Sequence, residues 1–123
     1  MIRTKRVAYT LPKDLIHFID WYSKWEKLSK SKLVLLCIEE GFELFEDELN
    51  EGEIIDYHSK KIKNTIPFTI TLPINVIEKL DYFHEKMIIP KTHLVVVSIT
   101  LLLEKINQQI DDDIKKLMES SEL

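Results

Sequence analysis

Glycine and cysteine are scarce in this chain: two of its 123 residues are glycine and one is cysteine. With so little glycine there is no glycine-rich phosphate-binding loop and no nucleophile elbow, which excludes two common signatures of enzymes. The lone Cys37 excludes a disulfide framework and a multi-cysteine metal site, and it suits a reducing compartment. The four histidines show no metal-ligand spacing with it; they are His17, His58, His84 and His93. We therefore expect a protein that is not an enzyme and that has no cofactor and no metal.

Long apolar runs are also absent. The longest, Leu94 to Leu103, is interrupted by Ser98 and Thr100 and is too short to span a bilayer. The segment Met1 to Pro12 is basic and lacks the apolar core of a signal peptide. The proportions of hydrophobic and charged residues, 45% and 31%, are those of a folded globular protein, with room for one compact domain or two very small interlocked units. The sequence predicts a cytoplasmic protein without a membrane partner.

One short pattern occurs twice, as Val7-Ala8-Tyr9-Thr10-Leu11-Pro12 and as Phe68-Thr69-Ile70-Thr71-Leu72-Pro73. Each copy alternates apolar residues with small or polar ones, which is the period of a half-buried strand. The proline then ends the strand and suits the first turn of a helix. Two such strands in an otherwise helical chain predict one two-stranded antiparallel β-ribbon, whose outward face is the working surface.

Helical spacing of apolar residues accounts for most of the remaining chain. We expect helices at 12–27, at 30–48, at 73–87 and from residue 91 onward. Ser29 is a good N-cap for the second helix, and Pro90 interrupts the chain at the corresponding place before the fourth. The sequence is therefore that of a mainly α protein with a single ribbon.

The whole arrangement is a repeat. When the chain is shifted by 61 residues, residues 7–46 lie on 68–107 without a gap, and ten of the forty positions are identical. The repeat resolves the ambiguous stretch Val95 to Thr100, which is rich in β-branched residues but matches a helical segment of the first copy. Cys37 and Ser98 occupy the same position, where a small residue would let the two long helices approach closely.

This repeat predicts the domain organisation. Residues 1–49 form a first unit, residues 50–65 a linker containing Gly52, and residues 66–107 a second unit. Residues 108–123 are expected to form a C-terminal helical extension, because apolar residues continue at helical spacing; they are Ile106, Ile110, Ile114 and Leu117.

Charge is unevenly distributed along the chain, although the net charge is only −4. Residues 1–32 carry eight Lys and Arg against three acids, whereas residues 33–56 carry nine acids and no base. The basic segment contains the first strand, so the ribbon is expected at the positive end of the molecule, where it would attract a polyanion.

The order strand, Leu-Pro, helix, turn, helix resembles the ribbon-helix-helix fold of the MetJ/Arc/CopG transcription-factor superfamily. The motifs that carry the resemblance are Val7-x-Tyr9-x-Leu11-Pro12 with Ser29-Lys30-Ser31-Lys32-Leu33, and Phe68-x-Ile70-x-Leu72-Pro73 with Lys91-Thr92-His93-Leu94. The family normally builds its ribbon from two chains. Two units in one chain imply an intramolecular pseudo-dimer, similar to some regulators of conjugative plasmids and archaeal viruses, and a viral origin would place it in the cytoplasm of the host cell. The chain departs from the family at Lys27 and Ile88, where many members have glycine, and at Pro90, which replaces the usual serine or threonine.

The resemblance implies sequence-specific binding of double-stranded DNA, with the ribbon in the major groove, by a transcriptional regulator that acts as a repressor. The residues implied for base contacts are Arg6, Ala8, Thr10, Thr69 and Thr71. The residues expected at phosphates are Arg3 and Lys5 ahead of the ribbon, Lys30, Ser31 and Lys32 at the second helix, and Lys91, Thr92 and His93 at the fourth.

Three other functions fit the same residues: an accessory DNA-binding factor for conjugation or partition, an antitoxin of a toxin–antitoxin pair, and a structural viral or assembly protein that has kept the fold. Phe18, Trp21 and Trp25 form an additional apolar stripe on the first helix. This stripe either packs under the linker or contacts another chain. Self-association through this stripe or through the C-terminal helix is the remaining expectation about partners.

Overall fold

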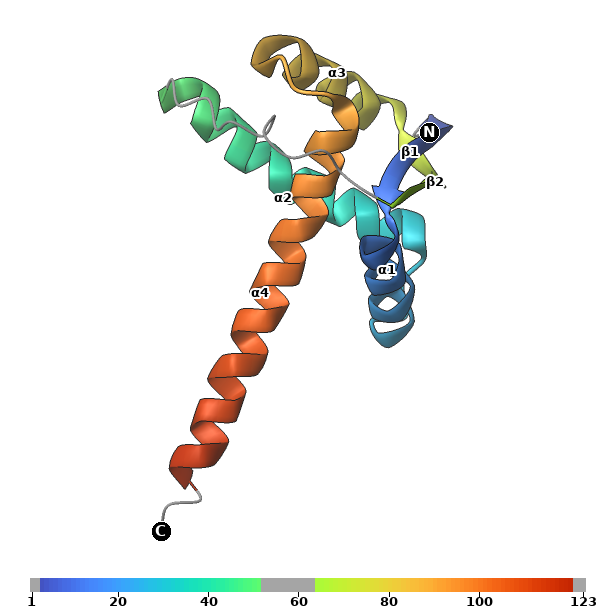
Figure 1. The fold of residues 1–123 in the computed structure, drawn as a ribbon. Coiled ribbons are helices and arrows are strands. Elements are labelled where there is room, and N and C mark those ends of the chain that lie inside the picture. The colour runs from blue at the N-terminus through green and yellow to red at the C-terminus, as the bar shows by residue number, and fades with distance from the viewer. Residues whose placement is uncertain (1–2, 52–63, 121–123) are drawn as a thin grey trace.

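The computed structural model describes residues 3–51 and 64–120, which form four helices and a two-stranded antiparallel sheet (Figure 1). The elements, in chain order, are β1 (Thr4–Pro12), α1 (Lys13–Trp25), α2 (Lys30–Glu51), β2 (Thr65–Pro73), α3 (Ile74–Met87) and α4 (Lys91–Ser120). The predicted class, mainly α with a two-stranded antiparallel ribbon, is confirmed. Because α2 continues to Glu51 and β2 begins at Thr65, the predicted linker, 50–65, includes the ends of two regular elements. Residues 52–63 of that linker lie outside the described residues.

Both strands are longer than the sequence pattern predicts, and they pair over their full length. Tyr9 lies opposite Phe68 and Val7 opposite Ile70. The inward face of the ribbon is apolar, and its buried residues are Tyr9, Leu11, Ile70 and Leu72. Since side chains alternate along a strand, the alternation seen in the sequence assigns one face to the core and the other to solvent.

The helices α1 and α3 begin without a side-chain cap, because each follows a proline. The first backbone N–H of α1, at Lys13, instead donates to the carbonyl of Asn64 (3.1 Å), which precedes β2. The first N–H of α3, at Ile74, donates to the carbonyl of Arg3 (2.9 Å), which precedes β1. Each helix start is thus hydrogen-bonded to the residue that leads into the opposite strand, which satisfies one of its otherwise unpaired donors.

Tight turns connect α1 to α2 and α3 to α4. Lys27 and Ile88 have left-handed backbone conformations, with φ of 56° and 58°. At these two positions many members of the ribbon-helix-helix family have glycine, whereas this chain has residues with a Cβ atom. The turns still adopt the left-handed conformation, which is strained for such residues. At the start of α2 the Ser29 hydroxyl accepts a hydrogen bond from the Lys32 N–H (3.0 Å), as expected of an N-cap.

The long helices α2 and α4 cross at the centre of the molecule (Figure 1). At the crossing Gly41 lies against Ser98, so closely that a Cβ atom on Gly41 would be 2.2 Å from the Ser98 Oγ. Ser98 is buried and its hydroxyl donates to the carbonyl of Leu94 (2.8 Å), within the segment that was ambiguous in sequence and is helical here. The predicted small residue at the helix contact is therefore present, and Gly41 is its partner.

The two long helices differ in what covers their C-terminal halves. Phe83 of α3 packs on α2, with its ring centroid 5.4 Å from that of Phe42 and 5.6 Å from that of Phe45. The repeat equivalent of Phe42 in α4, Leu103, also packs against the core, but beyond it α4 projects away from the rest of the molecule (Figure 1), and every residue from Asn107 to Ser120 is exposed. The predicted C-terminal extension is thus helical as far as Ser120 and continuous with the helix before it.

Within the described residues, no single helix has the length and hydropathy of a bilayer-spanning segment. Taken as a pair, α3 and α4 meet those criteria, but they are bent by 107° at the break between them.

Candidate nucleic-acid interface

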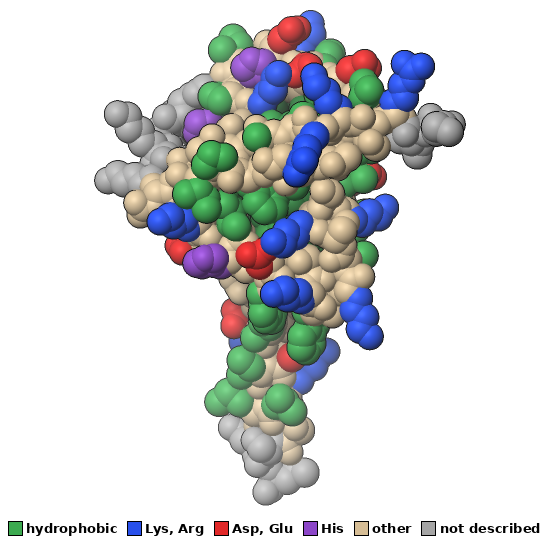
Figure 2. All heavy atoms as spheres, turned by 90° about the vertical axis from the view of Figure 1, so that its right-hand side faces the viewer, with side chains coloured by type: hydrophobic (Ala, Val, Ile, Leu, Met, Phe, Trp, Pro, Cys, Tyr) green, Lys and Arg blue, Asp and Glu red, His purple; other side chains and the backbone are tan. Residues whose placement is uncertain are grey.

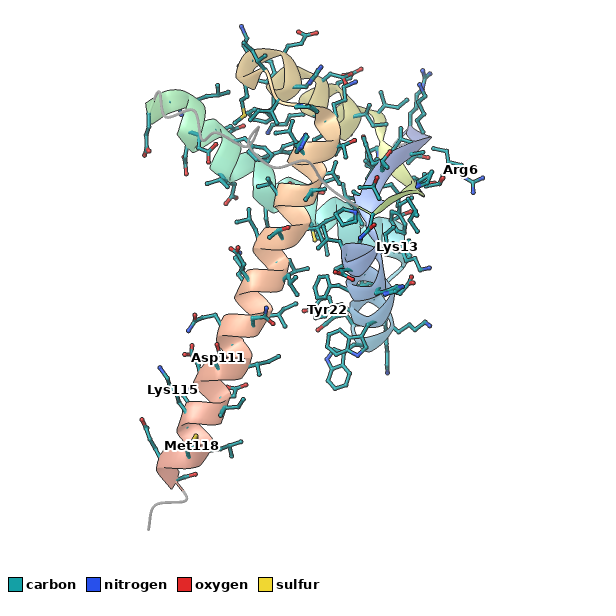
Figure 3. All side chains as sticks on the ribbon, viewed as in Figure 1. Arg6, Lys13, Tyr22, Asp111, Lys115 and Met118 are labelled. Carbon is teal, nitrogen blue, oxygen red and sulfur yellow. The ribbon has the colours of Figure 1, made fainter. Side chains whose placement is uncertain are left out.

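The outward face of the ribbon carries all five residues that the sequence assigns to base contacts. The strand register places Arg6 opposite Thr71 and Ala8 opposite Thr69. Thr10 lies opposite Pro67, which completes the face. These side chains are all exposed, and the two members of a cross-strand pair point to the same side of the ribbon. Figure 3 shows the Arg6 side chain extending away from the rest of the molecule.

The opposite face of the ribbon anchors it to the helices. Tyr9 is buried there, and this burial raises the pKa of its hydroxyl, with the Asp81 carboxylate adding to the effect. Leu11 and Leu72 are completely buried. The outward side chains therefore stand on a rigid, packed support, as a surface that recognises a fixed ligand shape requires.

Arg3 and Lys5, the two predicted phosphate contacts that precede the outward face in sequence, lie in different places. Lys5 pairs with Leu72 and so belongs by alternation to the inward side, near the end of the ribbon, where its side chain is exposed. Arg3 and Lys32 of α2 line the same open groove, together with Glu39 and the first turn of α3. The structure thus brings together two of the predicted phosphate contacts, Arg3 and Lys32, from separate elements.

At the start of α2 the predicted phosphate contacts already have partners within the protein. The Lys30 ammonium pairs with the Asp20 carboxylate at 2.5 Å. The hydrogen bond that Lys30 donates to the Asp20 carboxylate lowers the pKa of Asp20 below its ordinary value. Ser31 accepts a hydrogen bond from the Thr71 backbone N–H (3.0 Å), which ties the start of α2 to the opposite strand. The positive charge of Lys30 is therefore partly neutralised at its own site.

The start of α4 has the same arrangement. Lys91 is ion-paired with Asp81. His93 and Thr92 are partly exposed, and among the described residues the Nδ1 atom of His93 is buried without a hydrogen-bond partner. The helix N-terminus itself still presents backbone N–H groups, to which a phosphate oxygen can bind.

Positive side chains surround the ribbon. Figure 2, which views the molecule from the side on which the ribbon lies, shows Lys and Arg side chains spread over this surface, with fewer Asp and Glu in its central part. Among the described residues, no group of three or more His, Cys, Asp or Glu side chains is arranged to hold a metal ion.

The ion pairs at the two helix starts were missed by sequence reasoning, although a signal for them was present. Asp20 and Lys30 each recur unchanged 61 residues later, as Asp81 and Lys91. Two identical charged positions of opposite sign in both copies of a repeat indicate a pairing inside each unit. The sequence analysis assigned Lys30 and Lys91 only to phosphates and so did not predict their ion pairs with Asp20 and Asp81.

The aromatic stripe of α1 is divided between two environments. Phe18 stacks on Tyr22, with ring centroids 5.6 Å apart, and is partly buried against the core. Trp21 and Trp25 stack on each other at 6.1 Å and remain exposed at 54% and 71%. Packing under the linker falls on residues outside the described part of the chain, so both interpretations of the stripe remain predictions.

No protein-family model matches this chain, and neither does any curated protein or any solved structure.

Proposed function

We propose that this protein binds double-stranded DNA sequence-specifically by inserting the β1–β2 ribbon into the major groove, and that it acts as a transcriptional repressor by occupying its operator. The observation that carries the proposal is the outward face of the ribbon. It is exposed, nonionic apart from Arg6, rich in threonine and bounded by basic residues. A two-stranded β-ribbon is one of the few elements that fit the major groove.

The proposal includes two ribbon-helix-helix units joined as an intramolecular pseudo-dimer. The strand register supports this symmetry, because Ala8 pairs with Thr69 and these residues occupy the same position in the two copies of the repeat, 61 residues apart. The backbone contacts at the starts of α1 and α3 are equivalent under the same shift, as are the left-handed residues Lys27 and Ile88. Each of these features occurs in both units, as a two-fold axis through the ribbon requires.

The side chains on the outward face have the chemistry of base recognition. The Arg6 guanidinium can donate two hydrogen bonds to the O6 and N7 atoms of guanine. Thr69 and Thr71 can hydrogen-bond base edges or contact a thymine methyl group. Phosphates on either side of the groove would lie near the N-termini of α2 and α4, with Arg3 and Lys32 as additional cations.

The two strands present different residues to the DNA. Arg6, Ala8 and Thr10 of β1 correspond to Pro67, Thr69 and Thr71 of β2 under the repeat. A two-chain ribbon with identical strands reads a palindrome. A single chain of this protein should instead read a short, asymmetric element.

The test is a selection of bound sites from a random double-stranded DNA library, followed by footprinting on the DNA upstream of the protein's own gene. We expect an asymmetric core sequence. Arg6→Ala should weaken binding to that core by about 1–3 kcal/mol and relax the base preference at one position. Lys5→Ala is the matched control, because Lys5 is adjacent but lies on the other side of the ribbon, so this change should weaken binding to all sequences alike.

Three results would count against the proposal. Failure to shift any duplex at low salt would exclude DNA binding. A selected palindrome centred within a single ribbon footprint would mean that the strands pair between chains. If Arg6→Ala lowers affinity equally for every sequence, Arg6 contacts a phosphate and the face is oriented differently from what we propose.

A further inference from the structure

The end of α4 extends beyond the core of the molecule. From Asn107 to Ser120 every residue is exposed, yet the apolar side chains do not stop where the core ends. Ile106, Ile110, Ile114 and Leu117 follow one another at intervals of four, four and three residues, which places them on one side of the helix. Ile110, Ile114 and Leu117 are about half exposed or more.

Such a helix has little to stabilise it in isolation. Hydrogen bonds in this segment run along the helix itself, from the Gln108 side-chain amide to Asp112 (3.1 Å) and from that of Gln109 to Asp113 (3.2 Å). An isolated helix of this length is marginal in water, and most helices gain their stability from packing an apolar face. We therefore expect the apolar side of this part of α4 to be covered by a partner when the protein functions.

The charges along this helix indicate what covers it. Asp111, Asp112 and Asp113 form an acidic block, and Lys115 and Lys116 form a basic block directly after it. With 3.6 residues per turn, Asp113 and Lys116 border the apolar side on one edge and Asp111 on the other, whereas Asp112 and Lys115 lie away from it. In a parallel pair of two such helices opposite edges meet, which places Asp113 of each helix on the same border as Asp111 of the other, where they repel. In an antiparallel pair like edges meet, so Asp113 of each helix lies near Lys116 of the other, which is favourable.

We propose that the exposed end of α4 pairs with the same segment of a second copy of this chain, antiparallel and centred near Ile114. Ile114 then contacts Ile114 of the partner subunit, and Ile110 contacts Leu117 of the partner subunit. The contact is isologous, so it closes at a dimer and does not propagate.

This inference does not depend on DNA binding. Figure 1 shows that the end of α4 lies far from the ribbon, so the dimer would leave both ribbon faces uncovered.

The area available sets the strength of this dimer. Fourteen helical residues span about 21 Å, and such a contact buries less than the roughly 800 Å² per partner of a standard stable interface. We therefore expect a reversible dimer with a dissociation constant on the order of 1–100 μM.

Sedimentation equilibrium of the full chain, across concentrations that bracket this range, is the first experiment. The wild-type chain should change from monomer to dimer with concentration, and Ile114→Asp should raise the dissociation constant about tenfold or more. Gln108→Asp adds the same charge to the opposite side of the helix and should leave the equilibrium unchanged. Circular dichroism of each variant verifies that α4 remains folded.

Disulfide cross-linking tests the orientation. Cys37 is buried, and replacing it with serine leaves introduced thiols as the only ones. In this background Ile110→Cys and Leu117→Cys should form a disulfide with each other when the two variants are mixed, and neither should cross-link readily with itself.

Three outcomes would overturn the proposal. A chain that remains monomeric at every concentration would exclude the dimer. Self-cross-linking of Ile110→Cys and of Leu117→Cys, without the mixed product, would show a parallel pair. Loss of the dimer in Trp25→Ser but not in Ile114→Asp would assign the contact to the aromatic stripe of α1.

Discussion

The crossing of α2 and α4 offers the sharpest test of the packing, through the single substitution Gly41→Ala. In the interior of an exposed helix this change stabilises by about 0.5–1 kcal/mol, because alanine loses less backbone freedom on folding. At the crossing a second effect opposes it. The added Cβ atom would lie 2.2 Å from the Ser98 Oγ and 3.0 Å from the Ser98 Cβ, both well inside van der Waals contact. The sign of the net change therefore decides whether the helices are as close as described.

The magnitude follows from how the clash can be relieved. The Ser98 hydroxyl can rotate away only by losing its hydrogen bond to the Leu94 carbonyl, and the contact between the two Cβ atoms remains in any case. Inserting a methyl group into a packed core typically costs about 1–3 kcal/mol. After subtracting the helix-propensity gain, we expect Gly41→Ala to lower the free energy of unfolding by about 1–2 kcal/mol.

Urea unfolding at equilibrium, followed by circular dichroism, measures this change, and Ser98→Gly supplies the control because it removes both clashing atoms. The double variant should be more stable than the sum of the two single effects predicts, with a coupling of about 1–2 kcal/mol. An increase in stability on Gly41→Ala alone would refute the reasoning, since it would mean that space for a methyl group exists at the crossing.

Three further predictions concern the helix starts, the turns and the core. Lys30→Ala should reduce the salt dependence of DNA binding by about one unit, and Asp20→Asn should increase it by freeing the Lys30 charge; no change in either variant would mean that α2 does not meet the DNA backbone. Ile88→Gly should stabilise the fold by about 1 kcal/mol in thermal unfolding, because Ile88 is 78% exposed and its φ of 58° favours glycine, whereas a lower melting temperature would contradict this. Burial raises the pKa of the Cys37 thiol to about 12, so a thiol reagent at pH 8 should label it only when the protein unfolds, and rapid labelling of the native chain would show that the core is open there.

Several features of this protein could be predicted from the sequence because they depend on neighbouring residues. Alternation between Val7 and Leu11 determines which side chains share a face, and the following Pro12 ends the strand whatever surrounds it. Ser29 caps α2 through an atom three residues from its partner. The repeat extended this local information by showing that the segment after Val95 is helical, against its β-branched composition. The resemblance to the ribbon-helix-helix fold implied the five base contacts, and the alternation along the strands predicted that they share one exposed face.

Other features required the folded chain, because they join residues whose distance in sequence says nothing about their distance in space. No periodicity indicates that Gly41 lies against Ser98, or that the carbonyls of Arg3 and Asn64 complete the starts of α3 and α1. The pairing of Lys30 with Asp20 depends on the turn that brings the end of α1 beside the start of α2. Amphipathic spacing alone determined that α4 would continue as a helix, but only the tertiary structure decided that the core ends near Leu103, so that the apolar side chains beyond it, such as Ile110 and Ile114, are left exposed. The reason is that burial is a property of two surfaces, and a sequence pattern describes only one of them.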